Sequence, residues 1–459
     1  MKTLNIIAIL LIMASKAFSQ NPIIQTKFTA DPAPLVYHDT VFLYTGHDED
    51  DAFGFKMQNW LLYTSTDMVN WTDRGAVASV KDFKWGGIDN GAWALQCVHR
   101  NNKFYLYCPL PNNVGIGVLV SDSPYGPFKD AIGKPLIKNS KDDIDPTVMI
   151  DDDGQAYLYW GNPNLYYVKL NQDMISYSGE IIKDPSIAKT PGKPDPFHYQ
   201  EGPWAFKRNG KYYMAYASTC CPEGIGYAMS SSPTGPWEYK GSIMDGDPRS
   251  SGNHPGIINY KGTWYVFGFN YNIMKQTVSK HYERRSVSIE ELTFNPDGTI
   301  KHLPFWSVAG VKQRGTINPY SKVEAETIAY SEGLKTDNVT EWERNVSWDK
   351  GKKKAERVFV SSINNGDYLK VQGVNFASGA SAIEVCVAAL RGGRMEMHID
   401  KINGPLLGTV NVSDVAKGDV FSTMQAPLKA VKGVHDVYFV FKGEKDLFYF
   451  DWWKIAPSK

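Results

Sequence analysis

Short runs of aromatic and branched apolar residues alternate with polar turns over residues 20–317. The fullest example is the stretch 143–161, in which DIDPTVMI is followed by DDDG and then by QAYLYWG. An Asp-Gly pair between two apolar runs predicts a β-hairpin with a tight turn, here at Asp153 and Gly154. Similar hairpins are expected at four other places, and the second strands of the five end at Tyr44, Tyr107, Tyr159, Ala215 and Phe267.

The spacing of these hairpins predicts the fold of the first domain. The strand ends follow one another at intervals of about 52 to 63 residues, and a repeat of roughly that length built from short strands is typical of a β-propeller with one four-stranded sheet per blade. Five copies predict five blades over residues 20–317. The long stretches without a helical period agree with an all-β chain.

One chemically distinctive residue stands at nearly the same depth in each repeat. These residues are Asp31, Trp93, Asp145, Glu201 and His254. Each lies about 13 to 14 positions before its strand end, at the depth where the first strand of a propeller blade faces the central channel. The sequence therefore predicts a channel site that holds three carboxylates, an indole and an imidazole.

A second domain is expected after a boundary near residue 317. A chain of 459 residues exceeds one typical domain. Residues 318–459 alternate in short apolar runs that end in the sequence FDWW at 450–453, which predicts a β-sandwich of the jelly-roll kind.

Composition and the N-terminus narrow the function classes. The 49 basic and 49 acidic residues balance, which argues against nucleic acid as a partner. Aromatic residues are 13% of the chain, and such flat apolar faces suit a carbohydrate ligand. Residues 1–19 have the charged start, apolar run and small-residue end of a secretory signal peptide, and no other apolar run is long enough to span a bilayer. We expect an exported, periplasmic or extracellular monomer.

The cysteines and one acidic run are interpreted as structural. Five cysteines are few for a disulfide scaffold, and we expect buried free thiols, although Cys97 and Cys108 flank one turn and could face each other. The acidic run at 47–51 directly follows the first hairpin, and we interpret it as a solvated loop at the rim of the cavity rather than a metal site.

Four motifs in register with the repeat resemble glycoside hydrolase family 43. They are DPAP at 31–34, IDP at 144–146 with the following DDDG, EGP at 201–203, and the run from RSV at 285–287 to NPDGTI at 295–300. The resemblance implies a five-bladed propeller that hydrolyses glycosides with inversion, mainly at α-L-arabinofuranosyl and β-D-xylosyl linkages.

The same resemblance implies a role for each acid. Asp31 matches the general base and Glu201 the general acid, while Asp145 matches the residue that orients the acid and tunes its pKa. Inversion needs a base and an acid roughly 6.5 to 9.5 Å apart so that a water molecule fits between them and the sugar. A third carboxylate near Glu201 would raise the pKa of Glu201 by like-charge repulsion. The alternative, that these motifs only cap turns, is weaker because all three acids share one depth.

The resemblance also implies substrate contacts and a channel ion. Arg285 matches an arginine that hydrogen-bonds the sugar, and Trp93 keeps the ring that would stack on it. Trp204 could be a second sugar platform or part of the core. His254 matches a histidine that helps to hold a central Ca²⁺ through water, and a hydrogen-bonded ring without an ion is the alternative.

Residues 322–455 resemble a family 6 carbohydrate-binding module. The resemblance rests on EAE at 324–326, NGDY at 365–368, GVHD at 433–436 and FDW at 450–452. It implies a structural Ca²⁺ with Glu324, Glu326 and Asp451 as candidate oxygen ligands. Tyr449 and Phe421 depart from the usual sugar cleft, so the module could either bind sugar or support the propeller.

These features lead to one hypothesis and two rivals. The first is an inverting hydrolase that releases terminal α-L-arabinofuranose from plant cell-wall arabinan or arabinoxylan. A β-D-xylosidase with the same fold and mechanism is the nearer rival, and a non-catalytic sugar-binding propeller is the rival from another class. An acid-base set of three carboxylates argues against the last, because a lectin has no use for it.

Overall fold

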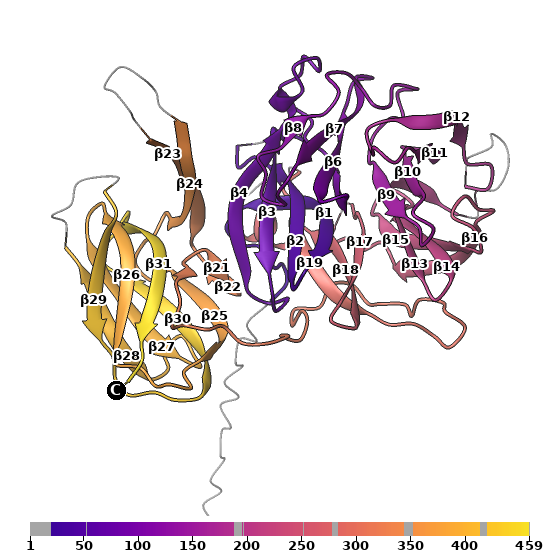
Figure 1. Cartoon of the computed structure of the whole chain (residues 1–459). Coiled ribbons are helices and arrows are strands. Elements are labelled where there is room, and N and C mark those ends of the chain that lie inside the picture. Colours follow the sequence, from indigo (N-terminus) through magenta and orange to yellow (C-terminus); the bar gives the residue numbers. More distant parts are fainter. Residues whose placement is uncertain are drawn as a thin grey trace, which may run out of the picture.

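The computed structural model describes residues 20–458 except for 52, 188–194, 196, 251, 278–282, 344–351 and 414–419. The predicted signal peptide at 1–19 therefore lies outside the described residues. Two all-β bodies stand next to each other, a propeller and a sandwich (Figure 1). In the described part of the chain, no helix is long and apolar enough to cross a membrane.

Five antiparallel sheets form the propeller, which confirms the predicted fold class. The first is β1 (Phe28–Tyr37), β2 (Thr40–Asp48), β3 (Asn59–Ser65) and β4 (Trp71–Ser79), and the second is β5 (Gln96–Arg100), β6 (Lys103–Leu110), β7 (Gly115–Ser121) and β8 (Lys129–Asp130). The third is β9 (Thr147–Ile150), β10 (Ala156–Trp160), β11 (Tyr166–Leu170) and β12 (Tyr177–Lys183), and the fourth is β13 (Tyr199–Arg208), β14 (Lys211–Ser218), β15 (Gly224–Ser230) and β16 (Glu238–Met244). The fifth is β17 (Gly256–Tyr260), β18 (Thr263–Asn270) and β19 (Ser286–Leu292). The short helices η1 (Val80–Asp82) and α1 (Asn272–Thr277) lie in connections.

The strand register repeats from blade to blade as the hairpin spacing predicted. The five aligned strand ends face Ala33, Gln96, Thr147, Trp204 and Gly256 on the inner strands. Each of these partners follows one of the distinctive residues by two or three positions. Because the register is the same, the backbone presents those residues at equivalent depths around the axis.

The first described residues close the ring of blades. The amide of Ile23 donates to the carbonyl oxygen of Val287 at 2.8 Å. The side chain of Asn21 donates to the carbonyl oxygen of Ile289 and accepts from its amide, both at 2.9 Å. The segment before β1 therefore completes the fifth blade along β19, which brings the two ends of the propeller sequence together.

The C-terminal body is a sandwich of two sheets with its own apolar core. Its strands are β20 (Val323–Glu324), β21 (Thr327–Ile328), β22 (Tyr330–Glu332), β23 (Lys335–Glu343), β24 (Lys352–Ser361), β25 (Tyr368–Asn375), β26 (Ala382–Ala389), β27 (Gly393–Ile399), β28 (Leu406–Val412), β29 (Ser422–Pro427), β30 (Val434–Lys442) and β31 (Phe448–Ala456). One sheet has the order β23-β24-β31-β26-β29, with β20 paired to β31, and the other has the order β22-β25-β30-β27-β28. Trp453 and Phe439 pack in the core between them.

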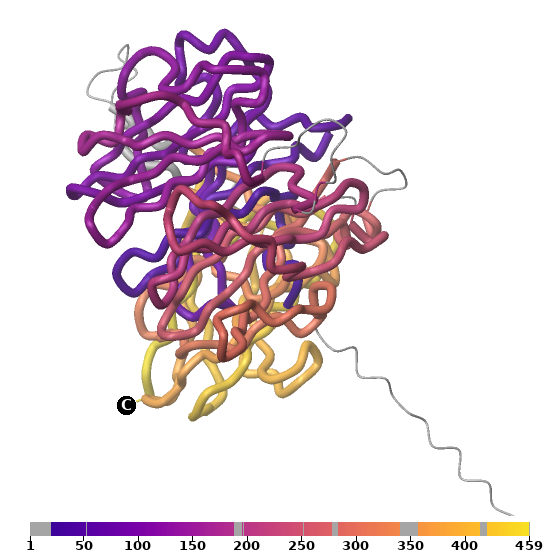
Figure 2. The backbone as a smooth tube through the Cα atoms, turned by 90° about the vertical axis from the view of Figure 1, so that its right-hand side faces the viewer, coloured from indigo at the N-terminus to yellow at the C-terminus, as the bar shows by residue number. Residues whose placement is uncertain are grey.

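A shared sheet, not a free linker, joins the two bodies. Strand β21 pairs with β4, so that it is the fifth strand of the first blade. The hydroxyls of Thr72 and Thr327 are 2.8 Å apart across this pairing. In Figure 2, viewed from the propeller side, the orange-to-yellow chain of the sandwich lies behind the propeller and reaches below it. The predicted boundary at residue 317 falls between β19 and β20 and stays a prediction.

Candidate active site

One cavity of about 450 Å³ lies at the channel of the propeller. All five distinctive residues of the repeats contribute to its lining, as does Arg285: they are Asp31, Trp93, Asp145, Glu201, His254 and Arg285. Residues that are more than 200 positions apart in the sequence thus converge. The fold places them together because each blade offers its inner strand to the same channel.

Irregular backbone turns the acids into the cavity. The pairing of β1 with β2 skips between Ala30 and Ala33, and Asp31 in this bulge has a φ of 51°. Asp145 has a φ of 56°, in the same left-handed region. A bulge re-aims a side chain and is common next to active sites, and strained backbone clusters at functional sites. A proline follows each of these aspartates and cannot donate a ladder hydrogen bond there.

Asp31 is held by an arginine that is itself held by a second aspartate. Nη1 of Arg285 donates to Oδ1 of Asp31 at 2.9 Å. Nε and Nη2 of Arg285 donate to the two carboxylate oxygens of Asp48 at 3.0 and 2.9 Å. Asp48 is completely buried at the end of β2. The interpretation of the run 47–51 as a solvated loop is therefore wrong for Asp48, because its charge is matched inside the protein by Arg285.

Glu201 and Asp145 lie on neighbouring blades and interact electrostatically. Nδ2 of Asn162 donates to Oε2 of Glu201, and the amide of Gly202 donates to Oδ2 of Asp145 at 3.1 Å. Burial raises the pKa of Glu201 and the charge of Asp31 raises it further, whereas Arg285 and the bond from Asn162 lower it. Burial also raises the pKa of Asp145 well above its usual value, and the charge of Glu201 adds to this. A buried cluster of like charges retains protons to higher pH than isolated carboxyl groups do.

His254 lies beside Asp31, and its ring packs on a glycine. Its Nδ1 is 3.6 Å from Oδ1 of Asp31, and burial lowers the pKa of the imidazole. A Cβ on Gly202 would lie 2.7 Å from the His254 ring, and Gly202 has a φ of 58°. Glycine is therefore required next to Glu201 both for the turn and for the approach of the ring.

The two candidate tryptophan platforms have different positions. Trp93 lines the cavity, where its ring centre is 6.4 Å from that of Phe55. Trp204 is buried in the apolar core, and its indole nitrogen donates to the carbonyl oxygen of Ile257 at 2.9 Å. Trp204 is not among the cavity-lining residues, so the structure favours the core alternative for it.

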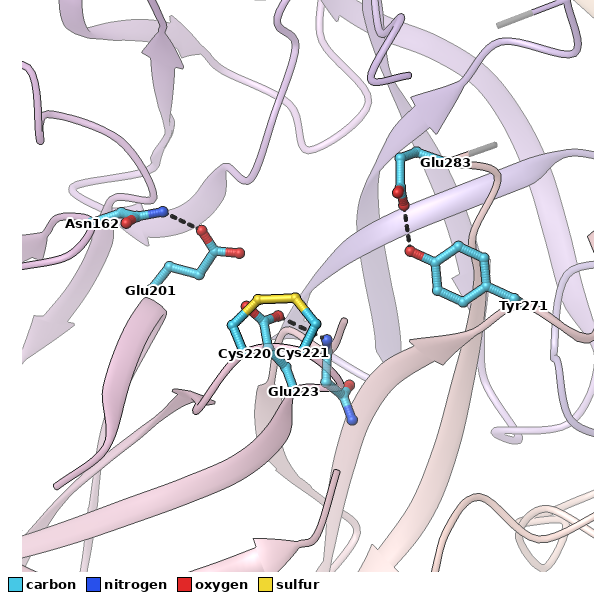
Figure 3. Close-up of a disulfide and its surroundings, with 8 residues drawn as sticks. Asn162, Glu201, Cys220, Cys221, Glu223, Tyr271 and Glu283 are labelled. Atoms are coloured by element: carbon cyan, nitrogen blue, oxygen red, sulfur yellow. Dashed lines mark hydrogen bonds between the residues drawn. A yellow bond between two sulfur atoms is a disulfide. The ribbon is translucent and has the colours of Figure 1, made fainter. Parts of the chain in front are cut away.

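Several residues that line the cavity were not predicted from the sequence. They are Asn162, Cys220, Cys221, Glu223, Tyr271 and Glu283, all shown in Figure 3. Cys220 and Cys221 form a disulfide with each other. The expectation of free thiols was right for Cys97, Cys108 and Cys386, which are buried, and wrong for this pair. The adjacent cysteines before Pro222 were the only signal in the sequence.

Glu223 is a buried acid of the cavity beside the three that the sequence predicted. Its side chain is 7% exposed, and burial raises its pKa to about 8, with the charge of Glu201 as a further cause. Nothing in the hairpin repeat marks this residue, because it lies in the connection between β14 and β15 rather than on an inner strand.

The candidate calcium ligands do not form a metal cluster. Within the described residues, no three histidine, cysteine or acidic side chains are placed to hold a metal ion. Asp451 pairs with Arg357 at 2.9 Å, and Glu324 pairs with Lys322 at 3.0 Å. Glu326 is buried, and its Oε2 has no hydrogen-bond partner. Calcium in either domain, including at His254, stays a prediction.

Comparison with known proteins identifies both bodies. The sequence model of glycosyl hydrolases family 43 matches residues 19–300, and that of the carbohydrate binding module (family 6) matches residues 324–457. The chain belongs to glycosyl hydrolase family 43. It is a glycoside hydrolase, and the resemblance drawn from the motifs is confirmed.

Some relatives align with almost the whole chain and others with a part of it. The chain is 33% identical to an arabinoxylan arabinofuranohydrolase of Bacillus subtilis over 95% of this chain and 92% of the relative. A crystal structure of a family 43 arabinoxylan arabinofuranohydrolase from Bacillus subtilis in complex with cellotetraose superposes with a TM-score of 0.81, at 30% identity, over 96% of this chain and 98% of that one. A xylosidase/arabinosidase of Bacteroides ovatus is 29% identical over 60% of this chain and 94% of its own length.

Proposed function

We propose that this family 43 hydrolase releases terminal α-L-arabinofuranose from arabinoxylan or arabinan with inversion at the anomeric carbon. The observation that carries the proposal is the cavity in which Asp31, Asp145 and Glu201 meet, with Arg285 bonded to the first of them. The names of the full-length relatives, arabinoxylan arabinofuranohydrolases, support the choice of sugar.

The arrangement suits a single displacement. Asp31, oriented by Arg285, takes a proton from a water molecule, whose oxygen attacks the anomeric carbon. The bond from that carbon to the leaving oxygen breaks, and Glu201 gives its proton to that oxygen. The raised pKa of Glu201 supports its role as acid, because a proton must be present at the start of each turnover. Asp145 accepts from the amide of Gly202, the residue after Glu201, and so helps to orient the acid.

The sugar would be bound by the remaining lining groups. Trp93 offers an indole face, and the guanidinium of Arg285 lines the same cavity. A β-D-xylosidase is the second candidate, since relatives that align with about 60% of this chain carry the name xylosidase/arabinosidase. The acids serve both sugars equally, so the choice depends on how the cavity wall contacts the ring.

The cellular setting follows from the leader and the module. We propose that residues 1–19 direct export, that the mature protein is a monomer, and that plant cell-wall polysaccharide is the partner of the family 6 module. N-terminal sequencing of protein from the culture medium and the periplasm tests the first point, and light scattering tests the second.

A substrate panel tests the function itself. Aryl α-L-arabinofuranoside, β-D-xyloside and β-D-galactofuranoside are compared for kcat/KM, and the first product is followed by NMR. We expect arabinofuranoside to be preferred and the product to appear with inverted configuration. Preference for the xyloside would select the second candidate. A retained configuration would overturn the mechanism, and no hydrolysis of any glycoside would overturn the enzyme assignment at this cavity.

A further inference from the structure

The turn between β14 and β15 brings a disulfide and an acid into the cavity beside Glu201. Glu201 on β13 pairs with Ala217 on β14, and the chain reaches Cys220 shortly after that strand ends. Figure 3 shows the Cys220–Cys221 disulfide between Glu201 and the pair formed by Tyr271 and Glu283. The fourth blade therefore supplies both the proposed acid and this part of the wall.

The turn is packed firmly onto the backbone behind it. The amide of Thr219 donates to the carbonyl oxygen of His198 at 2.8 Å. A Cβ on Gly246 would lie 2.3 Å from the carbonyl oxygen of Pro222, so the turn rests directly on the chain at that glycine. A wall that is held on both sides keeps its position when a ligand binds.

Glu223 is fixed through one oxygen and open through the other. Its Oε2 accepts from the amide of Asn253 at 3.2 Å, which ties it to the fifth blade. Its Oε1 has no hydrogen-bond partner among the described residues and is not among the atoms cut off from solvent. Since Glu223 lines the cavity, this oxygen is available to a bound molecule.

The chemistry of the turn matches one side of a sugar. Sulfur is soft and polarisable, and two adjacent sulfur atoms make a small apolar surface. Sugar rings have faces of carbon-bound hydrogens between their hydroxyls, and binding cavities combine apolar walls with a few fixed polar groups. The disulfide and the open oxygen of Glu223 provide these two elements within four consecutive residues.

We propose that the Cys220–Cys221 disulfide and Glu223 form a substrate-binding wall that helps to select the sugar. The two sulfur atoms contact a face of the ring bound next to Glu201, and Oε1 of Glu223 forms a hydrogen bond with one of its hydroxyls. The inference rests on the proposed function, because the occupant is the pentose that the acids cleave.

The number of free thiols tests directly whether the disulfide forms. The described structure pairs Cys220 with Cys221 and leaves three cysteines as thiols, out of five in the chain. Thiol titration of denatured protein is expected to count three groups before reduction and five after it. Five before reduction would show that the wall does not form and would overturn the proposal.

The decisive measurement compares KM and kcat before and after reduction with a phosphine. For the aryl glycoside that the enzyme prefers, we expect KM to rise about tenfold and kcat to change by less than about twofold, as for the loss of an apolar contact to the ring. The double variant Cys220→Ser/Cys221→Ser should show the raised KM without reductant and no further change with it. The matched control Cys386→Ser, in the sandwich, should respond to reductant as the wild type does.

Two variants of Glu223 separate a substrate contact from a structural role. Glu223→Gln keeps a hydrogen-bonding side chain and is expected to leave KM within about threefold of the wild type, whereas Glu223→Ala should raise it about tenfold. The thermal midpoint is followed for each protein. An unchanged KM in both the reduced enzyme and Glu223→Ala would overturn the wall while the proposed function stood. A raised KM that comes with a lower kcat and a lower thermal midpoint would assign the turn a purely structural role and overturn the wall as well. If the wild type cleaves no glycoside of the panel, the proposed function fails and the wall fails with it.

Discussion

The propeller and the sandwich each contain a buried aspartate that is paired with an arginine. The two pairs differ in their surroundings. Asp31 shares Arg285 with Asp48, and all of this network except Asp48 lines an open cavity. Asp451 pairs with Arg357 in the sandwich, where Asp451 is buried and the side chain of Arg357 is 29% exposed. Under the proposed function, the ion pair with Arg285 orients a reactive group, whereas the ion pair with Arg357 joins β24 to β31.

The largest effect is expected when the proposed base or the proposed acid is removed. Asp31→Ala and Glu201→Ala should each reduce kcat by roughly a thousandfold or more, because the base or the proton donor is lost. Circular dichroism should stay close to that of the wild type, whereas Asp31→Ala is expected to lower the thermal midpoint, because the buried Arg285 loses a carboxylate partner. Asp451→Ala is the matched variant and should leave kcat on aryl glycosides unchanged. Turnover like that of the wild type in either propeller variant would contradict the assigned roles.

The second test compares the partners of the two arginines. Asp48→Ala leaves the buried charge of Arg285 with one carboxylate fewer, and breaking a buried pair costs about 3 to 5 kcal/mol of stability. Asp451→Ala should cost less, because the side chain of Arg357 is 29% exposed and water can replace its partner. Urea unfolding followed by fluorescence measures both. Equal losses would show that burial of the arginine is not what separates the two sites.

The third test asks whether the module supports the propeller. Removal of residues 322–459 takes away β21, which leaves the edge of β4 without its partner strand. It also removes the hydroxyl of Thr336, which donates to Asp73 at 2.6 Å, and each such bond contributes about 1 kcal/mol. We expect a lower thermal midpoint of the propeller. A more precise variant, Thr336→Val, should lower it slightly, and an unchanged midpoint in both would favour a module that serves only to bind polymer.

The smallest expected effect concerns the pH dependence. Activity requires Glu201 to be protonated, so it falls as the pH rises through the raised pKa of Glu201. The amide of Asn162 bonds to the carboxylate form and lowers this pKa. Asn162→Ala should therefore shift the alkaline limb of kcat/KM to higher pH, by less than about one unit. A shift to lower pH would contradict the direction assigned to this bond.

The inner face of the propeller could be predicted because it is periodic. Each hairpin has a local turn signal, and strand alternation places one residue per blade at the same depth. Asp31, Asp145 and Glu201 could thus be grouped although they are far apart in the chain. Asp48 could not be assigned in the same way, because an acidic run looks alike whether water or Arg285 balances its charge.

The amino-acid sequence by itself determined the number of blades, the sandwich and the three acids, since turn residues and apolar alternation act over a few neighbouring positions. Only the tertiary structure decided that Arg285 bridges Asp31 and Asp48, that β21 joins the first blade, and that Cys220, Cys221 and Glu223 reach the cavity. These contacts join residues from connections and from distant strands. Their partners depend on how the blades close around the axis, and no local pattern in the chain encodes that closure.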